Sequence, residues 1–278
     1  MGYRYETHMH TVQGSLCGKS TGAEQARFYK EMGYQGIIIT DHFFGGNTTM
    51  PKEGNWKDRI DCFCRGYEDA LAEGQKIGLD VFFGWEECFS RDDGRDEYLI
   101  YGLDKQWLYE HPEVEFWTRK QYFDGVHAAG GCMIQAHPFR KRDYIKEIRL
   151  GLAYCDGIEA ANSGNDQWAD VCAMRYAKEF DLPAIAGSDN HLCTMHGPEG
   201  SRLLLGIELD EPLKDIHDLV DRILRHDPIG LVVPENRFVQ DPANSPYYET
   251  FWLDENEKLV PAAGAMERMA LSSAIHHE

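Results

Sequence analysis

The feature that most constrains this chain is a repeated pattern in which a predicted strand ends in a histidine or an acid. The first strand, predicted over residues 3–11, ends in the pair His8 and His10. Side chains at i and i+2 of an extended backbone point the same way, so the two imidazoles can converge on one point. Imidazole is the commonest metal-binding side chain, and the pair therefore suggests part of a metal site. Taken alone, it fits two incidental histidines equally well.

The same arrangement recurs along the chain. The residues that directly follow later apolar runs are Asp41, His42, Glu86, His137, Asp189 and His191. These runs alternate with helical patterns, which is the signature of stacked β/α units. In a closed β/α barrel the carboxyl ends of the strands meet on one face, where active sites are built. We therefore expect these residues to share one site, because scattered structural histidines have no reason to favour strand ends.

The spacing of apolar and turn residues predicts the remaining elements. Further strands are expected at residues 36–40, 80–87, 97–102, 131–136, 157–159, 182–187 and 201–207, with a charged turn at 90–96. Helices are expected at about residues 21–32, 60–77, 118–129, 166–180 and 213–225. Thr21 followed by Glu24 fits a capping box at the start of the first helix. Residues 1–227 are interpreted as one α/β barrel, and the proline-containing residues 228–278 as an extension packed on it.

Composition excludes several classes of protein. A net charge of −19 over 278 residues argues against a surface that coats nucleic acid. No apolar run reaches the roughly 20 residues that cross a bilayer, and the N-terminus lacks the pattern of a secretory leader. The 8 cysteines are scattered without a compact disulfide framework. A cytoplasmic protein is the expectation, and the sequence gives no signal for its oligomeric state.

Taken together, the motifs resemble those of a known family. The segments at residues 6–11, 40–42, 84–86, 136–138 and 187–191 resemble, in order, the motifs of the PHP family, the polymerase and histidinol phosphatase domain. The resemblance covers roughly residues 3–225. It implies a distorted (β/α)7 barrel that holds two or three divalent ions of zinc, manganese or iron. It also implies hydrolysis of a small phosphorylated metabolite, a phosphomonoester, by a metal-bound hydroxide.

The resemblance also implies a set of metal ligands. Around one ion it places His8, His10, Glu86 and Asp189. To a second ion it assigns Glu86 and His137, and to a third His42 and His191. Carboxylates can bridge two cations, and neutral imidazoles leave coordination positions open to water and substrate. Asp189 or a histidine such as His191 would protonate the leaving oxygen. Asp41 would either orient a metal-bound histidine or only cap the backbone.

The chain departs from the family pattern at two positions. The loop after the first strand often supplies an aspartate or a histidine, and here its only soft ligand is Cys17. The strand after Glu86 often opens with a histidine, and Glu97 stands there instead. Each of the two is either a ligand or an ordinary residue, so a two-metal site and a three-metal site both remain open.

Three other residues each have two possible roles. Arg140 either grips a substrate phosphate with its planar guanidinium or lies on the surface in the basic run 140–142. His196 either contacts substrate or is an exposed loop histidine. Glu159 ends a strand and either faces the site or makes an ordinary hydrogen bond. Glu87 is expected to point away from the site, because successive side chains of a strand alternate.

The leading functional hypothesis is a phosphoesterase that acts on a small anionic substrate. An amidohydrolase-like enzyme that cleaves a carbon–nitrogen or ester bond also opens with His-x-His on a barrel strand. This alternative lacks a lysine at a strand end to bridge the metals, and Glu86 takes that place. A metal-binding module without turnover is the third hypothesis, because PHP domains fused to polymerases can lose ligands.

Overall fold

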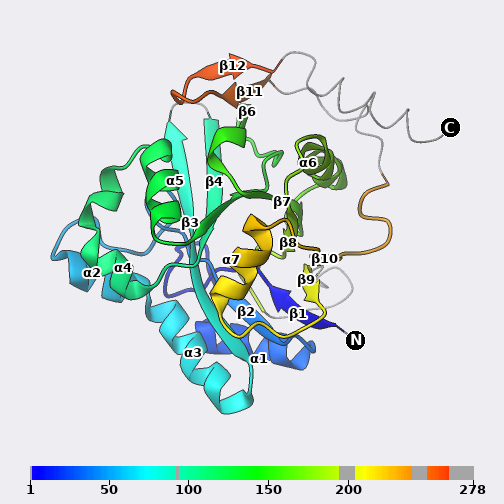
Figure 1. The fold of residues 1–278 in the computed structure, drawn as a ribbon. Helices are drawn as coiled ribbons and strands as arrows, with labels where there is room; N and C mark the ends of the chain where they lie inside the picture. The colour runs from blue at the N-terminus through cyan, green and yellow to red at the C-terminus, as the bar shows by residue number, and fades with distance from the viewer. Residues whose placement is uncertain (1, 92–93, 194–203, 240–248, 263–278) are drawn as a thin grey trace.

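A single curved sheet forms the centre of the molecule (Figure 1). The computed structural model describes residues 2–91, 94–193, 204–239 and 249–262. The strands are β1 (Tyr3–Glu6), β2 (Gly36–Ile39), β3 (Asp80–Arg91), β4 (Gly94–Tyr101), β5 (Cys132–Ala136), β6 (Glu147–Leu150), β7 (Gly157–Asn162), β8 (Ala184–Gly187), β9 (Gly206–Leu209), β10 (Gly230–Val232), β11 (Glu249–Leu253) and β12 (Leu259–Pro261). Their order is β10-β9-β1-β2-β3-β4-β5-β7-β8, with β6, β11 and β12 off this path. The fold is therefore α/β with a nearly closed, barrel-like sheet, as the sequence predicts.

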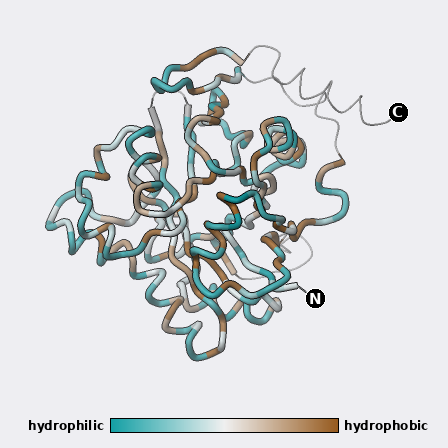
Figure 2. The backbone as a smooth tube through the Cα atoms, in the orientation of Figure 1, coloured by the Kyte–Doolittle hydropathy of each residue, from teal (hydrophilic) through white to brown (hydrophobic). Residues whose placement is uncertain are grey.

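Helices connect the strands and cover the outside of the sheet. They are α1 (Gly22–Glu31), α2 (Trp56–Phe63), α3 (Arg65–Ile77), α4 (Lys105–Glu110), η1 (Pro112–Phe116), α5 (Arg119–Ala128), η2 (Leu152–Tyr154), α6 (Gln167–Glu179) and α7 (Ile216–Leu224). The capping box predicted at Thr21 and Glu24 is present at the start of α1. Brown stretches in the middle of Figure 2 follow the apolar strands, and teal marks much of the outer surface. None of the described helices is long and apolar enough to cross a membrane.

The ring closes at the point where the first predicted metal ligands stand. Met9, just after β1, forms a parallel bridge with Asn190, just after β8. The amide of His10 donates to the Asn190 carbonyl at 2.9 Å, and the Asn190 amide donates to the His8 carbonyl at 3.3 Å. The ends of β1 and β8, which are about 180 residues apart in the chain, are thus hydrogen-bonded to each other.

The charged turn predicted at residues 90–96 is wrong. β3 and β4 form one long antiparallel hairpin whose register runs from Gly84 opposite Tyr101 to Arg91 opposite Gly94. The pairing continues past the site because Phe89 is buried and its ring packs edge-on against Tyr98. β4 therefore begins at residue 94 and not at 97.

The long helix predicted at residues 60–77 is also wrong, since α2 and α3 are separate helices that meet at Cys64. α2 begins earlier than predicted, because the side chain of Asn55 accepts hydrogen bonds from the amides of Lys57 and Asp58. α3 approaches the site closely at Gly66, where a Cβ atom would lie 2.0 Å from Thr11 Oγ1. The change of direction at Cys64 lets this glycine pack against the loop that follows β1.

Several further boundaries differ from the prediction. The last helix, α7, begins at residue 216 and not at 213, because Asp215 caps it through the His217 amide. The strand predicted from residue 201 begins at Gly206 in the described part of the chain, and residues 201–203 lie outside it. α4, η1 and β6 were not predicted. Residues after 227 supply β10, which pairs with β9, and β11, which pairs with β6.

Glu87 provides a test of the strand pleat. Its carboxyl is buried on the side of β3 opposite Glu86, next to the Tyr122 hydroxyl, and burial raises its pKa well above the usual value of 4.5. The folded protein holds this proton more tightly than the unfolded chain, so its contribution to stability is lost as the pH rises above 4.5. We expect Glu87→Gln to remove a decline of up to about 1.4 kcal/mol per pH unit in the free energy of unfolding. Urea denaturation of both proteins across neutral pH measures the difference, and parallel pH profiles would contradict it.

Candidate metal centre

Side chains that follow β1, β2, β5 and β8 meet Glu86 of β3 and Glu97 of β4 at one end of the barrel. Potential ligand atoms lie within 4.8 Å of one another in overlapping groups. The groups are His8, His10 and Asp189; His8, Glu86 and His137; His10, His42 and His191; and His42, Glu86 and Glu97. The structure therefore brings together the histidines and acids that the motifs single out, from strands far apart in the sequence.

The two imidazoles of the opening pair face each other. His8 Nε2 lies 3.2 Å from His10 Nε2, and Asp189 Oδ1 lies 3.1 Å from His10 Nε2. Asp189 adopts a positive φ of 50° and His137 one of 29°, a region that residues other than glycine rarely occupy. Such backbone strain persists where the surrounding structure enforces it, and it is concentrated at functional sites.

Glu159 fixes the orientation of the His8 ring. Its Oε1 lies 2.8 Å from His8 Nδ1, and its Oε2 accepts hydrogen bonds from the His137 amide and the Asn162 side chain. A carboxylate oxygen accepts, so His8 Nδ1 is the donor in this contact and Nε2 is the nitrogen left to face the cluster. This is the arrangement of a metal-binding histidine that a carboxylate holds in place.

Ser15 fixes the orientation of the His10 ring. The Ser15 hydroxyl donates to Asp41 Oδ1 at 2.7 Å, so its oxygen is left to accept from His10 Nδ1 at 3.1 Å. Neutral His10 then has a bare lone pair at Nε2. Asp41 further accepts from the amide and the hydroxyl of Thr11, both at 2.7 Å. Asp41 thus lies behind the cluster and acts on His10 through Ser15.

These contacts test whether the site fits cations. The two Nε2 atoms, 3.2 Å apart, need a cation between them: either a proton, since Glu159 and Asp189 overcome the effect of burial and raise the pKa of His8 well above 6.5, or a metal ion. His42 Nδ1 and Glu86 Oε2 are buried 2.7 Å apart, yet neither has a hydrogen-bond partner of suitable geometry in the described part of the chain. Buried polar atoms almost always have hydrogen-bond partners, so converging nitrogen and oxygen atoms without such partners are typical of a metal site. The residues present fit divalent metal ions.

The electrostatics of the cluster favour ionised carboxylates. Burial would raise the pKa of Glu86, but His42 and His8 hold it well below its usual range. The same burial effect on Asp189 is overcome by Arg140 and His8, so its pKa also lies well below the usual range. Both carboxylates therefore carry negative charge at neutral pH, which attracts cations.

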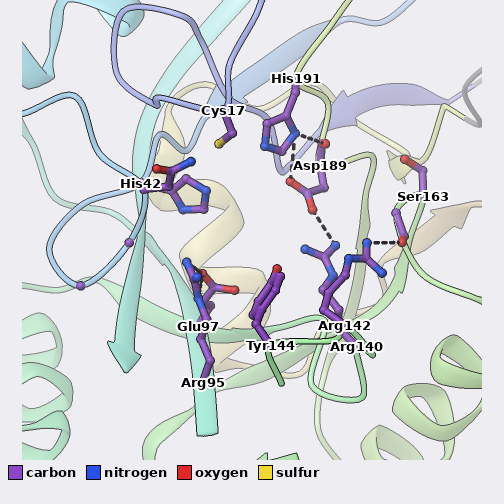
Figure 3. A pocket seen from close by; sticks show the side chains of 14 residues that line it. Cys17, His42, Arg95, Glu97, Arg140, Arg142, Tyr144, Ser163, Asp189 and His191 are labelled. Atoms are coloured by element: carbon purple, nitrogen blue, oxygen red, sulfur yellow. Dashed lines mark hydrogen bonds and ion pairs between the residues drawn. The ribbon is translucent and has the colours of Figure 1, made fainter. Parts of the chain in front are cut away.

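A cavity of about 640 Å³ opens directly onto this cluster. Figure 3 shows the labelled residues that line it. They are Cys17, His42, Arg95, Glu97, Arg140, Arg142, Tyr144, Ser163, Asp189 and His191. Several of these side chains are cationic, in a protein whose net charge is −19.

Arg140 is not a surface residue. Its side chain is 11% exposed, and Nη2 donates to Asp189 Oδ2 at 2.5 Å and to Asn162 Oδ1 at 2.7 Å. Nε donates to Asn165 Oδ1 at 3.0 Å. The guanidinium is therefore fixed in orientation at the wall of the cavity.

The two departures from the family pattern both lie at the site. Cys17 lines the cavity with His191 and His42, and although burial opposes the effect, these histidines lower the pKa of its thiol to about 6. Glu97 Oε2 lies 3.7 Å from His137 Nε2, and Glu97 Oε1 is paired with Arg95 at 2.8 Å. Their binding of metal stays a prediction. His196 lies outside the described residues.

Sequence reasoning missed the residues that support the ligands. Ser15, Asn162 and Arg142 were not singled out, and the role of Glu159 was left open. A serine five residues after His10 carries no recognisable signal, because its contact depends on how the loop folds back. Glu159 stood at the end of the strand predicted at residues 157–159, but β7 continues to Asn162, so Glu159 lies inside the strand with its carboxylate at His8.

Comparison with known proteins agrees with the fold. No family model matches the chain. A stretch of 71 residues is 39% identical to a 5'-3' exoribonuclease of Haemophilus influenzae and covers 24% of this chain and 26% of that protein. Another of 104 residues is 30% identical to a CAI-1 autoinducer synthase of Vibrio campbellii and covers 35% of this chain and 25% of that protein. The chain thus matches about a quarter of the length of these curated relatives.

A solved structure shares the architecture more fully. It is a two-domain protein of Bacteroides vulgatus that contains a predicted PHP-like metal-dependent phosphoesterase. The TM-score is 0.56 at 15% sequence identity, over 84% of this chain and 65% of that chain. The chain therefore has a PHP-like fold, as its motifs predict.

Substitution of Ser15 or Glu159 tests whether these residues hold His10 and His8 in place as metal ligands. We expect Ser15→Ala and Glu159→Ala each to weaken binding of Zn²⁺ or Mn²⁺ by about 10–100-fold, because the ligand ring loses its fixed tautomer and orientation. Competition with a chromophoric chelator measures the affinity. Glu87→Gln is the matched control, since it changes a buried acid in the same strand as Glu86 but on the other side. Unchanged affinity in both alanine variants would contradict this role.

Proposed function

We propose that this chain is a metal-dependent phosphoesterase that hydrolyses a small phosphomonoester. The observation that carries the proposal is the set of converging, unsatisfied ligand atoms beneath a cavity with cationic walls. The cluster fits cations, and the cavity fits the anion that those cations would act on. The PHP-like fold is consistent with this activity.

Two or three divalent ions of zinc, manganese or iron would be held by the overlapping groups. The residues are His8, His10, Glu86, His137 and Asp189, with His42 and His191 at the cavity side. When bound, such ions supply positive charge to phosphoryl oxygens and lower the pKa of water. Glu86 is suited to serve two ions, because Oε1 faces His137 at 3.0 Å and Oε2 faces His42 at 2.7 Å.

The residues of the chain would bind and orient the phosphate. Arg140 is held by Asp189, Asn162 and Asn165, so its guanidinium needs no reordering when an anion arrives. Asp189 contacts both His10 Nε2 and Arg140 Nη2, so it fixes the position of one side chain relative to the other. Because the pKa of Asp189 is well below its usual range, it binds and orients and does not serve as the proton donor to the leaving oxygen.

Arg142 supports an anionic substrate independently of the metal cluster. Its Nη1 and Nη2 donate to the carbonyls of Lys141 and Gly164, both at 2.8 Å. Among the described residues no carboxylate forms an ion pair with it, although it lines the cavity. We infer that its charge is available to a ligand; Figure 3 shows Arg142 beside Arg140 at the cavity wall.

The direct test is hydrolysis by the metal-loaded chain. We expect release of phosphate from nitrophenyl phosphate or from members of a panel of sugar and nucleotide phosphates. His8→Ala and Asp189→Ala should abolish it, because each removes a ligand atom from the cluster. The control is Glu87→Gln, which should retain activity. No hydrolysis of any phosphate, or activity on amides alone, would overturn the proposal.

A second test addresses substrate binding. We expect Arg142→Gln to raise KM by about 10–150-fold and to leave kcat nearly unchanged, since a lost charge-assisted hydrogen bond costs about 1.5–3 kcal/mol in binding. Steady-state kinetics on the best phosphate of the panel give both constants. Arg225→Gln is the matched control, because that arginine follows the C-terminal end of α7 and does not line the cavity. An equal effect of the two substitutions would exclude a role for Arg142.

A further inference from the structure

A buried ion pair lies against the turn at residues 162–165, which joins β7 to α6. Arg237, which follows β10, donates from Nε to Asp170 Oδ2 of α6 at 2.6 Å, and the two side chains are 8% and 0% exposed. Neither residue lines the cavity. Removing two charges from water is costly, so a buried ion pair is weak evidence for a role in stability alone.

The segment after β10 is fixed against β7 and the turn. Phe238 packs against the apolar cluster that contains Ala161 of β7. Arg237 Nη2 donates to the carbonyls of Asn162 and Asn165 at 2.8 and 3.0 Å. The guanidinium of Arg237 thus holds the backbone at both ends of the turn.

Asp170 fixes the direction of the Asn165 side-chain amide. Its Oδ1 accepts from Asn165 Nδ2 at 2.9 Å, and its Oδ2 accepts from the backbone amide of Asn162 at 3.2 Å. A carboxylate oxygen accepts, so the NH₂ group of Asn165 faces Asp170. The carbonyl oxygen of the same side chain is therefore directed away from Asp170.

That oxygen contacts Arg140. Asn165 Oδ1 accepts from Arg140 Nε at 3.0 Å, and Asn162 Oδ1 accepts from Arg140 Nη2 at 2.7 Å. The same Nη2 donates to Asp189, and Figure 3 shows the Arg140 guanidinium directed at that carboxylate. If the amide of Asn165 turned over, its NH₂ group would face the donors of Arg140. Asp170 thus acts on Arg140 through Asn165.

We propose that Arg237 and Asp170 are positioning residues that hold Arg140 in the orientation that binds the phosphoryl group of the substrate. Arg237 holds the backbone of the turn, and Asp170 holds the side-chain amide that meets Arg140. Arg237 stands 67 residues beyond Asp170 in the chain, so substrate affinity depends on a segment remote from the ligand motifs. This inference rests on the proposed function for the identity of the ligand, a phosphate, but not on turnover.

Binding of inorganic phosphate to the full, Zn²⁺-loaded chain tests the proposal. Arg237→Lys keeps a positive charge beside Asp170 but cannot reproduce the rigid fork of Nε and Nη2 donors. We expect this variant to raise the Kd of inorganic phosphate by about tenfold or more, because a small displacement of a binding group has a large effect. Isothermal titration calorimetry measures the Kd, and elemental analysis should show an unchanged content of Zn²⁺.

Asp170→Asn is a second variant of nearly the same shape. Its amide has one acceptor oxygen in place of two, so its NH₂ group must face a donor, either that of Asn165 or those of Arg237 and Asn162. We expect weaker phosphate binding here as well, with circular dichroism like that of the wild-type chain.

Arg119→Lys is the matched control. Arg119 forms a similarly buried pair with Asp96, with side chains that are 4% and 2% exposed, and neither residue lines the cavity. This variant should bind phosphate like the wild-type chain. Unchanged phosphate affinity in Arg237→Lys and Asp170→Asn, an equal loss in Arg119→Lys, or no phosphate binding by the wild-type chain would overturn the proposal.

A double-mutant cycle separates positioning from a general loss of stability. In an Arg140→Gln background we expect Arg237→Lys to change the Kd of phosphate by less than about threefold, since the side chain through which it acts is absent. A loss as large as in the wild-type background would contradict the proposal. Phosphate binding that depends on Arg237, without hydrolysis of any phosphate ester, would overturn the proposed function alone. Hydrolysis together with unaltered phosphate affinity in Arg237→Lys would overturn this inference alone.

Discussion

The whole centre depends on one buried carboxylate, that of Glu6, at the closure of the barrel. Its Oε1 accepts hydrogen bonds from the amides of Thr7 and His8 on one side and from the amide of Ser188 on the other, at 2.8–3.0 Å. Its Oε2 accepts from the Tyr29 hydroxyl of α1 at 2.7 Å. One side chain thus joins β1, β8 and α1 directly beneath the ligand residues. Without it, buried amides at the ends of both strands would lose their partner, and such a loss costs about 1–3 kcal/mol for each group.

This arrangement of ligand atoms is expected to lower the stability of the metal-free protein. The supporting hydrogen bonds of Glu159 and Ser15 leave His8 Nε2 and His10 Nε2 3.2 Å apart, and His42 Nδ1 and Glu86 Oε2, although 2.7 Å apart, make no hydrogen bond of suitable geometry in the described polypeptide. Buried polar atoms without partners are unfavourable, so part of the binding free energy of a metal ion removes a cost that folding has already imposed. Metal binding and folding are therefore linked, and the ions are expected to stabilise the fold as ligands of the native state only.

The sequence predicts the ends of strands well because they obey local rules. An apolar β-branched run such as residues 36–39 can only be a buried strand, and a residue that follows it must appear at the edge of the sheet. That reasoning finds His8, His137 and Asp189, which follow β1, β5 and β8, and it also finds Glu86, although β3 continues past Glu86 to Arg91. It fails where tertiary packing determines the register, the helix boundaries or the fold of a loop. The register of the β3–β4 hairpin depends on Phe89 meeting Tyr98, and the break at Cys64 on the approach of Gly66 to Thr11. Ser15 reaches His10 only because the intervening loop folds over Asp41.

Histidine and carboxylate side chains differ in how many ions each can bind. An imidazole whose other nitrogen is tied to an acceptor offers one lone pair, and each such histidine can serve one ion. A carboxylate offers two oxygens, and Glu86 directs one toward His137 and the other toward His42. In the proposed centre the imidazoles would therefore limit the number of ions, and Glu86 is the residue that could link them. A loss of Glu86 would separate the inner and cavity-side positions, whereas a loss of one histidine would empty a single position.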